Sequence, residues 1–228
     1  MDDDTEKDII EAEGTHEELL EEKEAAFSGN KRFFGQKIEG KLHGIMEHYD
    51  EDKNLVAHLP FEAGQLHGET RRYDSSQQLK ETMRYQNGIP HGLAEFYKNG
   101  RTRMHTTYVQ GKLHGETIFY NEGGTIRARI QYRDGQKNGA AISYDSLGHV
   151  KRILHYQNGV LQGPSIDYYP SGAILESGNY IDGLKEGEFR SYYENGAVHR
   201  RLVFDRGRLI RKPEIYDTQG NLTSTGIY

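Results

Sequence analysis

The chain has 228 residues, no cysteine and a formal net charge of −6, so disulfides, thiolate metal sites and cysteine nucleophiles are excluded. Hydrophobic residues make up 34% of the chain, which indicates a thin core, and no apolar stretch approaches the roughly 18–20 residues that span a bilayer. The N-terminal sequence MDDDTEKD lacks the basic and apolar regions of a signal peptide. We therefore expect a cytoplasmic protein, or a periplasmic one if a leader precedes this sequence.

Residues 1–32 form an acidic N-terminal segment. Residues 1–30 hold 12 acids and 2 bases, which leaves 23 acids and 27 bases for residues 31–228. Thr15 and Glu18 match a capping box and predict a short helix over about residues 16–27. We expect this helix to cover the first open edge of a sheet, because exposed edges usually need blocking. A disordered acidic tail and a partner-binding helix are the alternatives.

An internal repeat dominates the rest of the chain. Phe33 and Phe34 begin an extra strand, and eight repeats follow, whose first glycines are 24 residues apart except from the third to the fourth, where the spacing is 23. We number positions within a repeat from its first glycine, at Gly40, Gly64, Gly88, Gly111, Gly135, Gly159, Gly183 and Gly207. In the second strand of the shortened third repeat, the count is raised by one to keep the alignment. Position +4 is again glycine in seven repeats, at Gly44, Gly68, Gly92, Gly115, Gly139, Gly163 and Gly187. Position +9 is tyrosine in all eight, at Tyr49, Tyr73, Tyr97, Tyr120, Tyr144, Tyr168, Tyr192 and Tyr216.

Each repeat is predicted to be a β-hairpin. Asn87-Gly88 and Asp134-Gly135 are typical of the tight turns that join repeats, and Asn99-Gly100 is typical of a turn within one. Residues 33–228 should therefore form one all-β domain, an elongated antiparallel meander of about eight hairpins, preceded by the short N-terminal helix.

The second strand of each repeat alternates in character. Positions +15, +19 and the aromatic +21 are predicted to make one apolar face, as in Leu79, Met83 and Tyr85. The opposite face is predicted to carry a basic stripe made of Lys80, Arg103, Arg127 and Lys151 at +16 and of Arg129 and Arg201 at +18. A solvated face is the ordinary interpretation of such a stripe. Partner binding is the functional alternative, and these six residues are our candidate binding site.

The repeated segments GKLHGETIFYNEGGTIRARIQYRDG and GLKEGEFRSYYENGAVHRRLVFDRG resemble MORN repeats of the bacterial variant type. The resemblance covers residues 40–228. It implies a ribbon-like antiparallel sheet that binds proteins without chemistry of its own, and bacterial arrays of this type are commonly described as antitoxin-like or immunity proteins. Repeat 1, whose turn lacks glycine, and repeat 8, where Arg211 and Pro213 replace the usual opening, depart from the pattern.

The sequence offers little for catalysis or metal binding. His43, His67, His91 and His114 share position +3, but equivalent positions in successive hairpins lie about 9–10 Å apart, too far for one zinc ion. The loop from Asp50 to Asn54 begins like a calcium loop but lacks its glycine and its glutamate, so we interpret it as a polar turn. The overall charge disfavours nucleic acid as a partner of the tyrosine ladder. An enzyme with a carboxylate pair stays an alternative, although no spacing selects a pair.

We therefore expect a non-enzymatic protein-binding repeat protein without a cofactor. The first hypothesis is an immunity or antitoxin protein that neutralises a cognate toxic effector by direct binding. The alternative is an assembly scaffold for cytoskeletal or membrane-associated complexes. Membrane association is left open, although no spanning segment encodes it, and the oligomeric state is not determined by the sequence.

Overall fold

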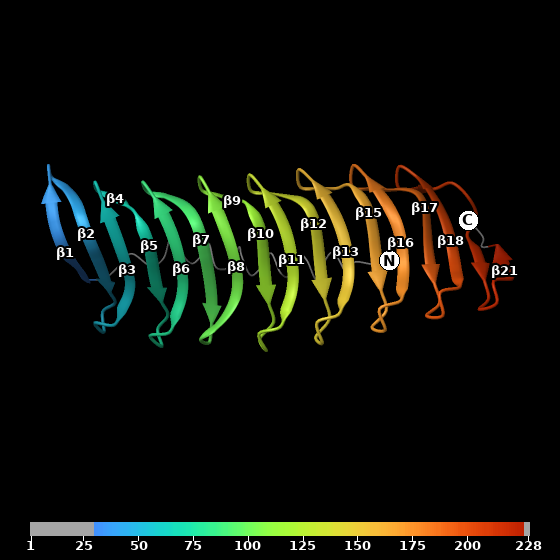
Figure 1. The fold of residues 1–228 in the computed structure, drawn as a ribbon, viewed down its shortest axis with the longest axis horizontal. Coiled ribbons are helices and arrows are strands. Elements are labelled where there is room, and N and C mark those ends of the chain that lie inside the picture. The colour runs from blue at the N-terminus through green and yellow to red at the C-terminus, as the bar shows by residue number, and fades with distance from the viewer. Residues whose placement is uncertain (1–29, 226–228) are drawn as a thin grey trace. The chain divides into compact units, whose positions relative to one another are not determined.

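The computed structural model describes residues 30–225, which fold into antiparallel β-strands joined by tight turns, with no helix in this range (Figure 1). The predicted helix over residues 16–27 lies outside the described residues. The strand predicted from Phe33 and Phe34 is confirmed as β1 (Asn30–Ile38). The other strands are β2 (Lys41–Tyr49), β3 (Leu55–Glu62), β4 (Gln65–Leu66), β5 (Gly68–Tyr73), β6 (Leu79–Gln86), β7 (Ile89–Lys98), β8 (Arg101–Val109), β9 (Lys112–Leu113), β10 (Gly115–Tyr120), β11 (Ile126–Arg133), β12 (Gln136–Tyr144), β13 (Val150–Gln157), β14 (Val160–Leu161), β15 (Gly163–Tyr168), β16 (Ile174–Ile181), β17 (Leu184–Tyr192), β18 (Val198–Asp205), β19 (Arg208–Leu209), β20 (Glu214–Tyr216) and β21 (Leu222–Thr225).

The chain divides into two compact units. The first unit contains the residues up to Gly124 together with Arg133–Gly135, and the second contains Thr125–Tyr132 and the residues from Gln136 on. Within the first unit β1 pairs with β2, β2 with β3, and β3 with β5, and the meander continues through β6, β7 and β8 to β10. Within the second unit the same order runs from β12 through β13, β15, β16, β17 and β18 to β20 and β21. The predicted hairpin meander is confirmed in each unit.

The turns between repeats depend on the first glycine of each repeat. In the turn before β4, Ala63 and Gly64 both have positive φ angles, 50° and 81°, as the two central residues of a type I′ hairpin turn require. The Gly64 amide also donates to the carbonyl oxygen of Leu42 in the preceding repeat, at 2.9 Å. The equivalent hydrogen bond recurs from Gly88 through Gly207, so each of these turns donates to the strand that follows the turn of the preceding repeat.

Position +10 closes the turn within a repeat in two different ways. In repeats 1, 2, 5 and 8 it is an aspartate whose carboxylate accepts backbone amides of its own turn; Asp50, for example, accepts the amide of Asn54 at 2.8 Å. In repeats 6 and 7 it is a tyrosine that reaches into the next repeat. The hydroxyl of Tyr169 donates to the carbonyl of Tyr192 at 2.8 Å, and that of Tyr193 donates to the carbonyl of Tyr216 at 2.9 Å. The Asp50 loop is thus a polar turn, as the sequence predicts.

In repeats 1, 2, 3, 5, 6, 7 and 8 the second strand carries a β-bulge at position +16. In repeat 2, Arg72 lies opposite Glu81 and the next residue, Tyr73, lies opposite Leu79, so Lys80 has no cross-strand partner. The same one-residue skip falls at Val56, Arg103, Lys151, Leu175, His199 and Thr223. Because side chains alternate along a strand, the extra residue moves position +15 to the face opposite +17 and +19.

The bulge corrects the predicted faces. One face of the sheet, which we call the buried face, carries positions +6, +8, +17, +19 and +21. The opposite face, which we call the tyrosine face, carries the tyrosine at +9 together with +5, +7, +15, +18 and +20. The prediction that +15 belongs to the apolar face with +19 and +21 is wrong. The prediction that +16 and +18 form one stripe is wrong for the same reason, since +16 is the bulge residue and +18 lies on the tyrosine face.

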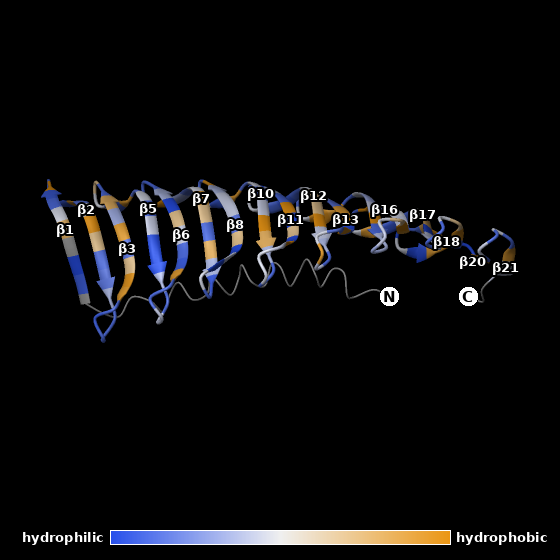
Figure 2. Cartoon of the chain, turned by 60° about the horizontal axis from the view of Figure 1, so that its bottom comes forward, coloured by the Kyte–Doolittle hydropathy of each residue, from blue (hydrophilic) through white to orange (hydrophobic). Residues whose placement is uncertain are grey.

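The core lies on the buried face. Every described side chain that is buried occupies this face, including Met83, Phe96, Met104 and Phe119, and apolar and polar residues alternate along the strands (Figure 2). Polar residues also occur there: Thr106 and Thr117 hydrogen-bond through their hydroxyls at 2.6 Å, and Arg152 forms a two-pronged ion pair with Asp167.

The two irregular repeats still form hairpins. In repeat 1 Lys53 adopts the positive φ of 68° that Gln77 takes in repeat 2 and glycine takes in the later repeats, and β2 pairs with β3 over six residue pairs. In repeat 8 the first strand is reduced to β20, because Pro213 offers no amide to the ladder. None of the described segments is a helix with the length and apolar character that crossing a bilayer needs.

Candidate binding site on the tyrosine face

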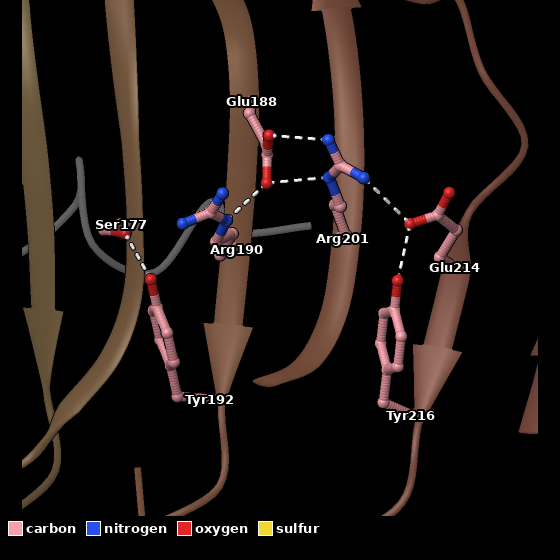
Figure 3. Close-up of polar contacts among 7 residues, drawn as sticks. All are labelled: Ser177, Glu188, Arg190, Tyr192, Arg201, Glu214 and Tyr216. Atoms are coloured by element: carbon pink, nitrogen blue, oxygen red, sulfur yellow. Dashed lines mark hydrogen bonds and ion pairs between the residues drawn. The ribbon is translucent and has the colours of Figure 1, made fainter. Parts of the chain in front are cut away.

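The clearest cluster of polar side chains on the tyrosine face spans β17, β18 and β20 of the second compact unit (Figure 3). The register places Arg190 opposite Arg201, and Arg201 opposite Glu214. Glu188 lies two residues before Arg190 on β17 and therefore points to the same face. Three neighbouring strands thus contribute charged side chains to one small area.

Arg201 is the centre of this cluster. Its Nε lies 2.8 Å from Oε1 of Glu188, and its Nη2 donates to Oε2 of the same carboxylate at 3.0 Å. Its Nη1 donates to Oε2 of Glu214 at 3.2 Å. Two nitrogens of Arg201 thus lie beside the two oxygens of Glu188, and Nη2 donates the hydrogen bond of this ion pair. Arg190 also donates to Glu188, so one carboxylate holds two guanidinium groups.

Tyrosines of the ladder extend the cluster at both sides. The hydroxyl of Tyr216 donates to Oε2 of Glu214 at 2.7 Å, and the hydroxyl of Tyr192 lies 3.3 Å from Oγ of Ser177 (Figure 3). A tyrosine at +9 and a glutamate two residues earlier form the same contact in Tyr49 and Glu47, and in Tyr97 and Glu95 at 2.8 Å. The tyrosine ladder is therefore coupled to the charged positions of its own face.

These contacts keep the cluster ionised. Hydrogen bonding from Arg201 lowers the pKa of Glu188, against an opposing contribution from burial. The hydroxyl of Tyr216 is the main cause of the lowered pKa of Glu214, with Arg201 contributing further. The Glu188 carboxylate in turn raises the pKa of Arg190 and of Arg201. Both carboxylates thus stay charged well below neutral pH, and the two pairs of opposite charges balance one another.

A pocket of about 520 Å³ opens beside the cluster, lined by Glu188, Arg190, Val198, Arg201, Tyr216 and the turn at Gly220 among others. Val198 is a +15 residue, and its place in this pocket follows from the bulge. The side chain of Arg190 is 49% exposed, whereas that of Glu188 is 26% exposed. Among the four charged side chains of the cluster, that of Arg190 is the most exposed, since those of Arg201 and Glu214 are 35% and 34% exposed.

The six basic residues proposed from sequence do not form one site. Lys80, Arg103 and Lys151 are bulge residues of different repeats, and Arg103 lies 3.7 Å from Glu122 with only 16% of its side chain exposed. Arg127 occupies the same position +16 in β11, and Arg129 follows at +18; both are partly exposed. Arg201 alone of the six lies in the polar cluster.

Sequence reasoning missed Glu188, Arg190 and Glu214. The signal that could have found them is a set of charges particular to repeats 7 and 8. Charged residues occupy +5, +7 and +18 of repeat 7 and +7 of repeat 8, two residues before its tyrosine. These positions converge only when the bulge and the pairing between repeats are known.

Comparison with known proteins bears on what the repeats are. Residues 42–63, 113–134, 137–158 and 185–205 match a family model described as a MORN repeat variant. Four segments of the chain are thus similar to MORN repeat variants. They include β2 and β3 of repeat 1 and the β17–β18 hairpin that carries most of the polar cluster.

Other comparisons add no functional information. No curated protein matches the chain. Similar solved structures include a crystal structure of TarM and one of an S. aureus TarM mutant with Fondaparinux, alpha-GlcNAc-glycerol and UDP, each 12% identical, with TM-scores of 0.23 and 0.22. Each match covers 74% of this chain and 23% of the TarM chain, so this chain spans less than a quarter of TarM's length.

Proposed function

We propose that this chain is a non-enzymatic protein-binding repeat protein, and that its partner binds to the tyrosine face of the second compact unit. The MORN repeat variant units support a protein-binding role. We place the partner-binding surface at the Glu188–Arg201–Glu214 cluster, because ion pairs hold its charged side chains in position across three strands beside an open pocket. A preformed surface of this kind limits the ordering cost of binding.

We further propose that the partner is a toxic effector that the protein neutralises by covering a functional surface. The resemblance of the repeats to bacterial immunity-type arrays supports this choice. A standard interface buries about 800 Å² on each partner, an area that three or four hairpins provide. Inhibition by coverage requires no catalytic group on this chain.

The test is affinity capture of the tagged full chain from its native cells, with retained proteins identified and quantified by mass spectrometry. One near-equimolar partner, whose enzymatic activity or toxicity disappears on mixing with the purified chain, is the expected result. Several substoichiometric structural or membrane proteins, none inhibited, would replace this proposal with the assembly scaffold.

A variant pair locates the binding face in the same experiment. Arg201→Glu places a third carboxylate between Glu188 and Glu214 and should abolish capture of the partner. Arg84→Glu is the matched control, because Arg84 lies on the tyrosine face of the first unit at 3.9 Å from Glu69, with its side chain 60% exposed. Equal capture by both variants would remove the tyrosine face of the second unit from the proposal.

A further inference from the structure

The pocket beside the Arg201 cluster has a counterpart two repeats earlier in the same compact unit. This second pocket, of about 330 Å³, is lined by His149, Val150, Ile153, Tyr168, Pro170 and the turn at Gly172. Both pockets are formed by positions +14, +15 and +18 of one repeat and by the +9 tyrosine and the turn of the next. They are therefore equivalent sites of the repeat, one between repeats 5 and 6 and the other between repeats 7 and 8.

The equivalence fixes the distance between the pockets. Two repeats comprise four strands, and neighbouring strands lie about 4.8 Å apart, so the pockets are about 19 Å apart across the strands. An extended peptide advances about 3.3 Å per residue, so about six residues span that distance. Because six is an even number, the two side chains that enter the pockets project from the same side of such a peptide.

The two pockets differ in chemistry. Val150, Ile153 and Pro170 give the first pocket apolar walls, closed on one side by Tyr168. Its volume accommodates one leucine-sized side chain, whose burial is worth about 1.5–3 kcal/mol. At the second pocket, Arg201 and Tyr216 already engage Oε1 and Oε2 of Glu188 and Oε2 of Glu214, while the Arg190 side chain is 49% exposed. This arrangement favours a carboxylate ligand over a cation.

The surface between the pockets suits the backbone of such a peptide. At the equivalent position between repeats 6 and 7, the Ile174 side chain is 41% exposed and Ser177 and Tyr192 place their hydroxyls 3.3 Å apart. These groups offer one apolar contact and two hydroxyls to a chain that crosses above them. The three equivalent positions thus change from apolar through mixed to charged, and Arg190 is the most exposed charged side chain at the last of them.

We propose that the tyrosine face of the second compact unit binds an extended, acidic segment of its protein partner, which crosses the strands with an apolar side chain in the Val150–Ile153 pocket and a carboxylate, about six residues away, on Arg190. This inference rests on the proposed function and gives the partner a recognisable sequence feature. It assigns binding roles to Ile153 and Arg190, which the sequence did not single out.

The test is selection of random 12-residue peptides displayed on phage against the immobilised full-length protein. The expected result is enrichment of peptides that carry an apolar residue and an aspartate or glutamate six positions apart. Binding of a synthetic enriched peptide should weaken at least about tenfold in Ile153→Asp and in Arg190→Gln, the loss typical of an anchor residue. The Arg190→Glu protein should select peptides with lysine or arginine in place of the acid.

Matched controls are available in the first compact unit. Leu93→Asp and Arg84→Glu change exposed tyrosine-face residues of the same chemistry outside both pockets and should leave peptide binding unchanged. Circular dichroism confirms that each variant is folded. Absence of enrichment, enriched peptides without the six-residue spacing, or binding that survives both substitutions would overturn the inference. If Ile153→Asp and Arg190→Glu still capture and inhibit the partner, the proposed function stands and this peptide site does not.

Discussion

The ring of Phe189 occupies the space that a side chain on Gly178 would fill. A Cβ atom built on Gly178 would overlap Cδ1 and Cε1 of that ring, and Phe189 is only 2% exposed. The ring also makes edge-to-face contacts with Tyr180 and Phe204, at centroid distances of 5.5 and 5.4 Å. Glycine replaces the leucine or methionine common at position +19, and phenylalanine replaces the small residues common at +6, so the two exchanges compensate one another.

Gly178→Ala should destabilise the second compact unit by about 1–3 kcal/mol through overpacking. Phe189→Ala should cost about 3 kcal/mol or more, because it leaves a cavity in the aromatic cluster. When Gly178→Ala is introduced into the Phe189→Ala variant, it should lower the free energy of unfolding only slightly, because the ring that would clash with its methyl group is absent. Urea unfolding of the two single variants and the double variant measures this coupling. Strictly additive losses would show that the ring does not depend on the glycine.

The tyrosine hydroxyls that reach from one repeat to the next should stabilise the C-terminal repeats. Tyr193→Phe removes the hydrogen bond to the Tyr216 carbonyl and should lower the free energy of unfolding by about 1 kcal/mol. Tyr169→Phe should behave alike. Tyr168→Phe is the adjacent control, and the same denaturation experiment should find it close to wild type. A loss of equal size in the control would assign the effect to the ring rather than to the hydroxyl.

Tyr97 should ionise far above the usual range of tyrosine. Burial, followed by the hydrogen bond to Glu95, raises the pKa of Tyr97 to about 12. The folded state favours the protonated phenol, so this contribution to stability is present below pH 10 and is lost as the pH rises toward 12. NMR titration of ¹³Cζ-labelled tyrosine follows the ionisation. Glu95→Gln should move the midpoint of Tyr97 downward, and an unchanged midpoint would leave burial as the sole cause.

Acid should weaken the aspartate-closed turn of repeat 1. The amide of Asn54 is the main cause of the lowered pKa of Asp50. Its stabilising contribution is therefore present above the unfolded pKa, near 3.8, and is lost as the pH falls through the lower folded value. Thermal unfolding between pH 2 and 7 should show a smaller acid-induced fall in Tm for Asp50→Ala than for wild type. Parallel curves would contradict the role given to the carboxylate.

The sequence predicts the fold of the repeats well because each hairpin is specified locally. Glycine opens every repeat and follows asparagine or aspartate at four of the eight junctions, and the tyrosine at +9 and the aromatic residue at +21 mark the two strands. The assignment of faces fails at one place. A bulge such as that at Lys80 leaves no mark in a strand's alternation, so Leu79 is read as a partner of Met83 when it lies on the other face.

The candidate site is predicted less well because it is built between repeats. Arg201 is recognised as one of six basic residues, but its partner Glu214 comes from the next repeat and Glu188 comes from the preceding strand. Their proximity depends on the pairing register, which a 24-residue period does not determine. Lys151 and Arg201, alike in charge, therefore have different environments.

The bulge also bears on how such a protein can change over evolutionary time. A bulge residue takes no part in cross-strand pairing, and valine, lysine, arginine, leucine, histidine and threonine all occur there in different repeats. The residues on either side are fixed by the ladder and by packing. Position +16 is thus a site where an array can acquire new surface chemistry, repeat by repeat, without rebuilding its sheet.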